Sequence, residues 1–184
     1  SFYLLLFLTL PILIETESVL AYWLGMVPEY TVLFCRLVLI NSLIDCISGP
    51  LMTATQATGK IKVYQAVVGS LLLINLPTSY LLLQNGFPPE TVLFVSIIIS
   101  IIALFVRLYL VMRLIHLSFK GFIINVLLRI LVVSSTSIIV PVILKHIMNP
   151  NLMQFFVVIL VSFLSVLFFI YWLGLEIKEK FFVK

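Results

Sequence analysis

The chain has 184 residues, of which 63% are hydrophobic and only 10% charged, with a net charge of +4. Soluble domains contain roughly 45–50% apolar residues, so this composition and a mean hydropathy of +1.30 exclude a water-exposed globular fold. The basic residues form no block with interleaved aromatic residues, which argues against nucleic-acid binding, and we expect a membrane protein.

Apolar runs follow one another along the chain, separated by short polar connectors. A helix needs about 20 apolar residues to cross the hydrocarbon core. A partial span at residues 2–24 is broken near residues 15–18, where Glu15 and Glu17 bring carboxylates that are costly in lipid. Complete spans are predicted at residues 31–56, 63–83, 91–115, 122–144 and 152–173.

The fold class follows from the length of these runs. Runs of more than about 20 residues without polar alternation favour helices over the strands of a barrel. We therefore predict an all-α, polytopic transmembrane helix bundle of about six spans, the first of them partial, in a single transmembrane domain. Pro77 removes a backbone donor inside the second complete span, at residues 63–83, and predicts a kink there.

Basic residues are distributed unequally between alternate connectors. One set of connectors carries Lys60, Lys62, Arg113, Lys120, Lys178, Lys180 and Lys184, whereas the other set carries Lys145 with His146. Because cytoplasmic loops are rich in Lys and Arg, we expect the first set and the C-terminus to be cytoplasmic, with Lys145 as the exception. The expected contacts to cytoplasmic headgroups are Lys60, Lys62, Arg113 and Lys120.

The span at residues 31–56 carries a polar stripe. On a helical count its members fall on one face, with Gly49 beside it: Asn41, Asp45, Ser48, Met52 and Gln56. An aspartate at the centre of a span costs about 2.5–3.5 kcal/mol on insertion scales, so Asp45 should face protein or water. The stripe either lines a substrate path or holds helices together.

Other polar residues at membrane depth are candidates for the same path. Asn75 lies just before Pro77, Arg129 lies inside the span at residues 122–144, and Arg36 lies near the outer end of the span at residues 31–56. The arginines either bind an anionic group or extend to the lipid headgroups, and Arg107 has the same two alternatives.

The sequence lacks motifs that are typical of catalytic, phosphate-binding or metal-binding sites. It has no paired catalytic acids, no Ser/His/Asp set and no glycine-rich phosphate loop. Cys35 and Cys46 lie about 16 Å apart on one predicted helix, too far apart for a disulfide, and without a Cys/His cluster nearby. We expect no enzymatic activity, no cofactor and no bound metal.

Three segments resemble one family of bacterial membrane proteins. They are Trp23-Leu24-Gly25-Met26-Val27-Pro28-Glu29-Tyr30, Ala57-Thr58-Gly59-Lys60-Ile61-Lys62-Val63-Tyr64-Gln65 and Asn75-Leu76-Pro77-Thr78-Ser79-Tyr80. Together they look like the C-terminal half of the polysaccharide biosynthesis proteins, the O-antigen and capsule flippases of the multidrug/oligosaccharidyl-lipid/polysaccharide exporter superfamily. The resemblance is specific between Pro11 and Pro89 and depends on helix spacing alone beyond them.

The resemblance implies one lobe of a two-lobe exporter in the bacterial inner (cytoplasmic) membrane. The implied substrate is an undecaprenyl-diphosphate-linked oligosaccharide. The implied partners are membrane lipid, the missing N-terminal lobe, and a polysaccharide polymerase with glycosyltransferases. Cavity arginines and lysines bind the diphosphate in this family, so Arg36 and Arg129 are the candidates for that role here.

Two alternative functions stay open. The first is an ion-coupled multidrug or metabolite exporter of the same superfamily, in which Asp45 would bind the cation or proton. The second is a non-transporting membrane scaffold of a polysaccharide assembly complex, in which Asp45 and Arg129 would pack against partner proteins. Because Ser1 stands in place of an initiator Met, we expect the chain to be a fragment that begins inside a span.

Overall fold

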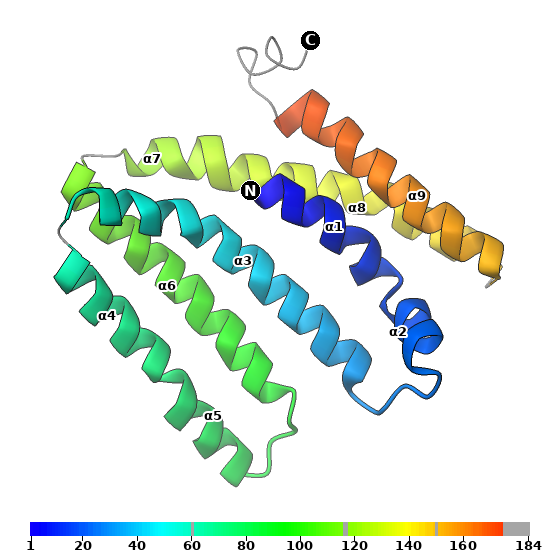
Figure 1. The fold of residues 1–184 in the computed structure, drawn as a ribbon, viewed down its shortest axis with the longest axis horizontal. Coiled ribbons are helices and arrows are strands. Elements are labelled where there is room, and N and C mark those ends of the chain that lie inside the picture. Colours follow the sequence, from blue (N-terminus) through cyan, green and yellow to red (C-terminus); the bar gives the residue numbers. More distant parts are fainter. Residues whose placement is uncertain (60, 116–117, 150, 175–184) are drawn as a thin grey trace. The chain divides into compact units, whose positions relative to one another are not determined.

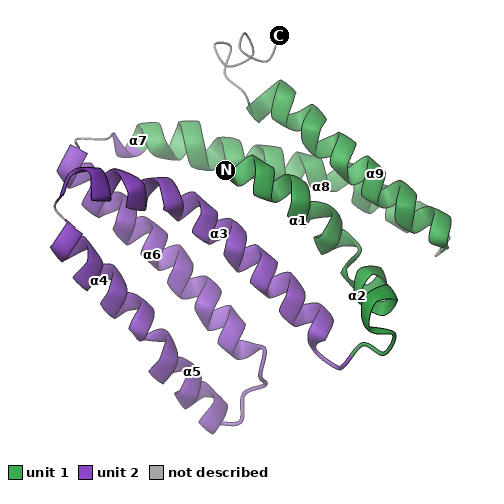
Figure 2. Ribbon diagram, viewed as in Figure 1, with its two compact units in different colours: residues 1–27, 120–184 green, residues 28–119 purple. Residues whose placement is uncertain are grey.

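The computed structural model describes residues 1–59, 61–115, 118–149 and 151–174. Helices account for 88% of this described part, which contains no strand, and this confirms the predicted all-α class. The chain divides into two compact units, unit 1 with residues 1–27 and 120–184 and unit 2 with residues 28–119 (Figure 2). The single domain expected from the sequence stays a prediction.

Unit 1 is built from both ends of the chain (Figure 1). Its helices pack α1 against α8 and α9, with α8 and α9 also packed together. Its elements are α1 (Phe2–Ile14), α2 (Thr16–Leu24), a short helix α7 (Phe119–Phe122) at the boundary, the π-helix η1 (Ile123–Leu128), α8 (Arg129–Ile147), α9 (Leu152–Phe169) and the π-helix η2 (Ile170–Gly174).

The core of unit 1 consists of small and branched apolar side chains between these helices. Leu10, Val133 and Val158 are at most 1% exposed. The rings of Phe7 on α1 and Phe163 on α9 lie 4.6 Å apart between centroids. Aromatic pairs at this separation add to the free energy gained from burial, so this pair helps to hold α1 against α9.

Unit 2 contains α3 (Thr31–Ala57), α4 (Ile61–Leu73), α5 (Asn75–Gln84) and α6 (Thr91–Ile115). Helix α6 is the central element, since α3, α4 and α5 all pack against it (Figure 1). Ala103, Leu108 and Val111 of α6 are fully buried. Leu104, Leu108 and Val111, with Leu104 5% exposed, are four and three residues apart, which places them on one face of the helix, and this face forms the core of the unit.

The predicted kink at Pro77 corresponds to the break between α4 and α5 at Ile74. A proline nitrogen cannot donate to the carbonyl four residues earlier, here that of Leu73. The next turn is held by Thr78, whose backbone N–H donates to the Ile74 carbonyl at 3.2 Å and whose hydroxyl donates to the Asn75 carbonyl at 3.1 Å. The helix therefore restarts directly after the break.

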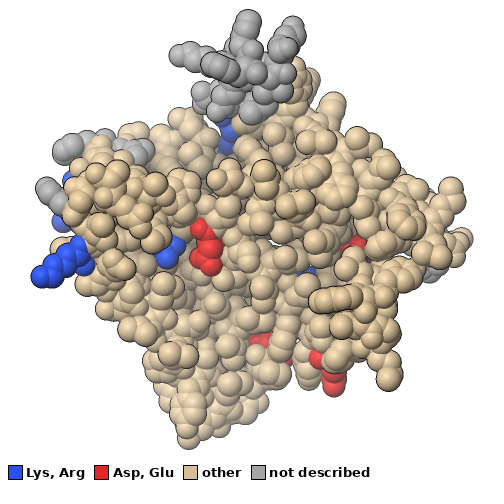
Figure 3. Space-filling view, in the orientation of Figure 1, with Lys and Arg blue, Asp and Glu red and all other residues tan. Residues whose placement is uncertain are grey.

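Five helical stretches are long and apolar enough to cross a membrane, and α1 with α2, bent by 76°, would make a sixth. The largest difference from the predicted spans is in the stretch Phe119–Ile147, which extends three residues beyond residues 122–144 at each end. Charged side chains are sparse on the face drawn in Figure 3. These helices define a multi-pass membrane protein.

Candidate functional site

The polar face of α3 centres on Asp45, near the middle of this 27-residue helix. The Asp45 side chain is exposed. Asn41 lies one turn earlier, and its Nδ2 donates to Asp45 Oδ2 at 3.2 Å. A carboxylate with several acceptor sites is thus oriented by a neighbour on its own helix while it keeps an accessible side.

The rest of the predicted stripe separates into a buried and an exposed part. Ser48 is 1% exposed, so it belongs to the packed side of α3. Met52 and Gln56 are exposed. The structure therefore brings Asn41 and Asp45 together, leaves Gln56 on the exposed side, and places Ser48 among the helices.

The other predicted path residues lie apart from Asp45 along the chain. Asn75 follows the break between α4 and α5, and its Oδ1 accepts a hydrogen bond from Ser79 Oγ at 3.1 Å. Arg36 lies in the first part of α3, and Arg129 begins α8 in unit 1. Both arginines are half-buried, and neither is without an interaction partner.

The cations expected at lipid headgroups lie at helix ends. Lys62, Arg113 and Lys120 are exposed, and the Arg113 guanidinium lies 4.8 Å from the centroid of the Tyr109 ring. Exposed cations at the ends of apolar helices suit headgroup contact. Lys60 lies outside the described residues, as do His116 and the C-terminal lysines Lys178, Lys180 and Lys184.

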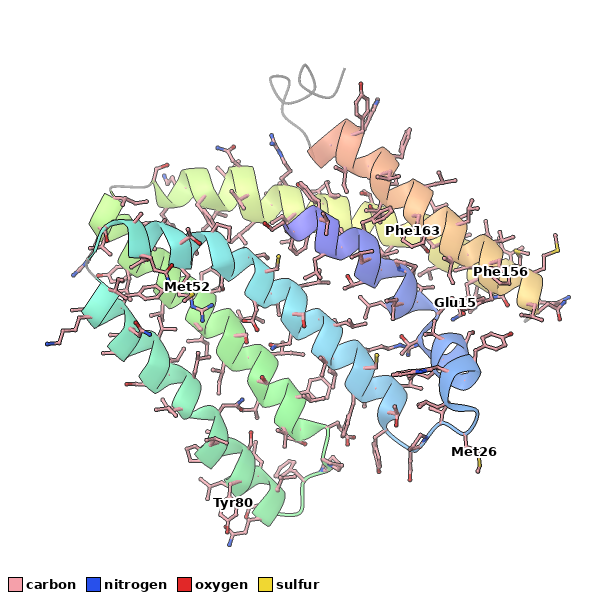
Figure 4. All side chains as sticks on the ribbon, in the orientation of Figure 1. Glu15, Met26, Met52, Tyr80, Phe156 and Phe163 are labelled. Atoms are coloured by element: carbon pink, nitrogen blue, oxygen red, sulfur yellow. The ribbon has the colours of Figure 1, made fainter. Side chains whose placement is uncertain are left out.

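An ion pair that the sequence analysis did not anticipate lies in unit 1. Glu15, between α1 and α2, is 2% exposed (Figure 4). Its Oε1 lies 3.3 Å from Nζ of Lys145 on α8, although the geometry does not make Oε1 a hydrogen-bond acceptor. Its Oε2 accepts from Ser18 Oγ at 2.7 Å. The charge of Lys145, the exception in the connector pattern, is therefore balanced locally.

The same ion pair supports the bend at the end of α1. The last carbonyls of a helix lack partners within it. Thr16 Oγ1 donates to the carbonyls of Ile12 at 2.7 Å and Leu13 at 3.0 Å, and Lys145 Nζ donates to that of Ile14 at 2.7 Å. A cation at a helix C-terminus is also favoured by the helix dipole. These hydrogen bonds give partners to the last carbonyls of α1, which would lower the stability of the bend if they were buried without partners.

A cavity of about 480 Å³ lies beside this pair in unit 1. Two residues connect the cavity to the pair: Ser18, which donates to Glu15, and Gln154, whose Nε2 donates to the Lys145 carbonyl at 3.0 Å. The other lining residues are Ala21, Tyr22, Asn151, Leu152 and Phe155. Two polar residues that line the cavity are therefore hydrogen-bonded to the two members of the ion pair.

Unit 2 holds a second cavity, of about 300 Å³, between α3, α4 and α6. Its polar lining is Gln56, Tyr64, Gln65 and Arg107, and its apolar lining is Met52, Ile61, Val68, Gly69 and Leu72. The Tyr64 hydroxyl and Arg107 Nε are buried atoms without a hydrogen-bond partner. Sequence analysis singled out Arg107 but missed Tyr64, which carries no signal of its own.

Comparison of the chain with models of known families, with curated proteins and with solved structures found no match. The described residues contain no group of three or more His, Cys, Asp or Glu side chains that could hold a metal ion. The helices and the two polar sites define an all-α, multi-pass membrane protein with ionisable side chains among its apolar helices.

Proposed function

We propose that this chain is one lobe of a membrane flippase that moves an undecaprenyl-diphosphate-linked glycan across the bacterial inner membrane. The observation that carries the proposal is Asp45, an exposed carboxylate in the middle of a membrane-length helix. A charge at this depth is tolerated where it borders a water-filled cavity or another polar group. The resemblance of residues 11–89 to the polysaccharide exporters supplies the substrate class.

The polar face of α3 suits such a substrate. A glycan headgroup needs a hydrated wall of hydrogen-bonding groups, whereas its prenyl tail can stay in the bilayer. Asn41, Asp45 and Gln56 offer donors and acceptors along one helix. Because Asp45 is held by Asn41 on its own helix, the carboxylate is oriented without being covered.

The test is translocation by the complete polypeptide that carries this chain, reconstituted in vesicles with a fluorescent undecaprenyl-diphosphate glycan. Wild-type protein should move the glycan to the opposite leaflet, and Asp45→Leu should reduce the initial rate about tenfold or more, since it replaces a hydrogen-bonding group in the path. Absence of glycan movement by the wild type would refute the proposal.

Accessibility separates the flippase from a scaffold. In a cysteine-free background, Asp45→Cys should react with a water-soluble maleimide, because a transport path is wet. A position packed dry against a partner protein would stay unlabelled. Leu37, 5% exposed on the same helix, supplies the matched control as Leu37→Cys, which should be protected.

A second candidate, an ion-coupled exporter of the same superfamily, is favoured by Glu15. This carboxylate is 2% exposed, has one oxygen without a hydrogen-bond partner, and is connected through Ser18 to a cavity. Ionisable side chains among apolar helices mark ion and proton pathways in transporters. Glu15→Gln should abolish the dependence of transport on a proton gradient, while exchange without a gradient continues. This result would favour the ion-coupled exporter over a flippase that needs no coupling ion.

A further inference from the structure

We propose that the cavity of unit 2 binds the phosphate group of a membrane lipid, with Arg107 and Tyr64 as its ligands and the lipid chain along the apolar wall. This inference goes beyond the proposed function and does not depend on it. It concerns a lipid held within one unit by Arg107 and Tyr64, which lie outside the Asp45 face, although Met52 and Gln56 of that face also line the cavity.

The polar groups of the cavity are in place before any ligand binds. Tyr64 is only 6% exposed, yet its hydroxyl has no hydrogen-bond partner, and Arg107 Nε is likewise buried without one. Leaving a buried donor unsatisfied is costly. Both residues line the same cavity, so an acceptor bound there would supply a partner to donors that have none within the chain.

The charge of the site selects an anion. Arginine presents planar donors that match phosphate oxygens. The cavity also lies at the N-terminal turn of α4, where Ile61 lines it and where free backbone N–H groups carry partial positive charge. Lys62, on the same turn, is exposed. None of the described residues that line the cavity is Asp or Glu, so a phosphate meets no carboxylate among them.

The apolar lining selects a lipid rather than a free anion. Met52, Val68 and Leu72 line the side of the cavity away from the start of α4, and Leu72 is 42% exposed, so the wall continues onto the outer face of the helix. Arg107 lies eight residues before the end of α6 at Ile115, about 12 Å along the axis. That depth is within reach of a headgroup phosphate.

The experiment measures lipid retention by native mass spectrometry of the complete, detergent-solubilised protein. The probes are phosphatidic acid, undecaprenyl phosphate, phosphatidylcholine and inorganic phosphate. Phosphatidic acid and undecaprenyl phosphate should bind more tightly than phosphatidylcholine, and inorganic phosphate should bind weakly. Equal retention of all three lipids would overturn the proposal, and tight binding of inorganic phosphate would overturn its lipid part.

Arg107→Gln should weaken phosphatidic acid binding about tenfold or more, because it removes a charge-assisted hydrogen bond. Tyr64→Phe should weaken it about threefold. The matched comparison is Arg113→Gln, which removes the same charge from the exposed end of α6, outside the cavity, and should weaken binding clearly less than Arg107→Gln does. Equal losses for Arg107→Gln and Arg113→Gln would show non-specific attraction and overturn the site.

A variant that removes no polar group tests whether misfolding explains a loss of lipid binding. A Cβ at Gly69 would meet no atom within 4 Å, so Gly69→Leu should fold and project into the cavity. It should keep the thermal midpoint of the wild type and lose phosphatidic acid binding, whereas Gly69→Ala should keep most of it. Undiminished binding to a stable Gly69→Leu protein would overturn the proposal.

Discussion

Unit 1 and unit 2 both hold ionisable side chains among apolar helices, but they compensate for them differently. In unit 1, Glu15 is buried against Lys145, and Lys145 also binds the Ile14 carbonyl. In unit 2, Asp45 is exposed, and Tyr64 and Arg107 have buried donor atoms without partners. The Glu15–Lys145 pair therefore stabilises the helices of unit 1, whereas Asp45 and Arg107 of unit 2 keep polar atoms to which a ligand could bind.

The largest expected effect comes from breaking the ion pair of unit 1. Lys145→Met leaves the buried Glu15 carboxylate unpaired and the Ile14 carbonyl without its donor. We expect a loss of about 3 kcal/mol in the free energy of unfolding, the lower end for a buried pair, because Lys145 keeps 32% of its side-chain exposure. Denaturant unfolding in detergent measures it.

Two further variants isolate the role of charge in that loss. The double variant Glu15→Gln with Lys145→Met removes both charges and should recover about half of the stability, since no unpaired charge is left. Lys120→Met removes an exposed lysine of the same unit and should change stability by less than about 0.5 kcal/mol. If Lys145→Met behaved like Lys120→Met, the contrast between the units would fail.

A change unrelated to charge should destabilise both units. Gly25 in unit 1 has φ +72° and Gly86 in unit 2 has φ +82°, backbone conformations that are unfavourable for other residues. Gly86→Ala should cost about 1–2 kcal/mol. Gly25→Ala should cost at least as much, because its ψ of −66° and the hydrogen bond from the Met26 N–H to the Leu24 carbonyl make Gly25 the centre of a strained γ-turn. Neither new Cβ meets an atom within 4 Å. Thermal unfolding would contradict this if either variant were neutral.

The broken helices provide another comparison, because unit 1 supports its break with polar groups and unit 2 makes its break with a proline. Pro77→Ala restores a backbone donor and should stabilise the α4–α5 junction by about 1 kcal/mol. Hydrogen exchange of the amides from Ile74 to Thr78 should slow. Pro89→Ala, in the exposed connector before α6, is the control and should leave those amides unchanged.

The smallest stability effect is expected at Asp45. Asp45→Asn keeps the shape of the side chain and removes an exposed charge, so the free energy of unfolding should change by less than about 0.5 kcal/mol. The translocation rate should nevertheless fall if Asp45 borders the path. Ser42→Ala, which removes a hydroxyl that donates to the Val38 carbonyl of the same helix, should leave the rate unchanged. A destabilisation as large as that of Lys145→Met would make Asp45 a packing residue.

The helices were predictable because their signal is local. Each apolar run and each turn residue lies within one stretch of sequence, so the spans agree with the structure to within a few residues. The pairing of Asn41 with Asp45 was equally accessible, since residues four apart on a helix are neighbours. Pro77 acts on its own turn, so its break was predicted as well.

The pair Glu15–Lys145 and the cavity of unit 2 could not be predicted in the same way. Each joins side chains from helices that are distant in sequence, and which helices pack together is decided by the whole fold. The signals present were two anomalies, a carboxylate that interrupts an apolar run and a lysine on the side poor in basic residues. Taken alone, Glu15 and Lys145 each looked like an exception, and their contact in the folded chain accounts for both.

The π-helix η1 has a consequence for the segment before α8. Its residues, Ile123–Leu128, are not buried, whereas α8 directs Ile130, Val133, Ser137 and Pro141 inward. A π-turn carries one residue more than an α-turn, and one residue corresponds to about 100° of rotation. Deleting a single residue there would let the segment close into ordinary α-helix, so that neither Lys120 nor the inward face of α8 turns by that angle, and this wide turn can absorb length changes that an α-helix could not.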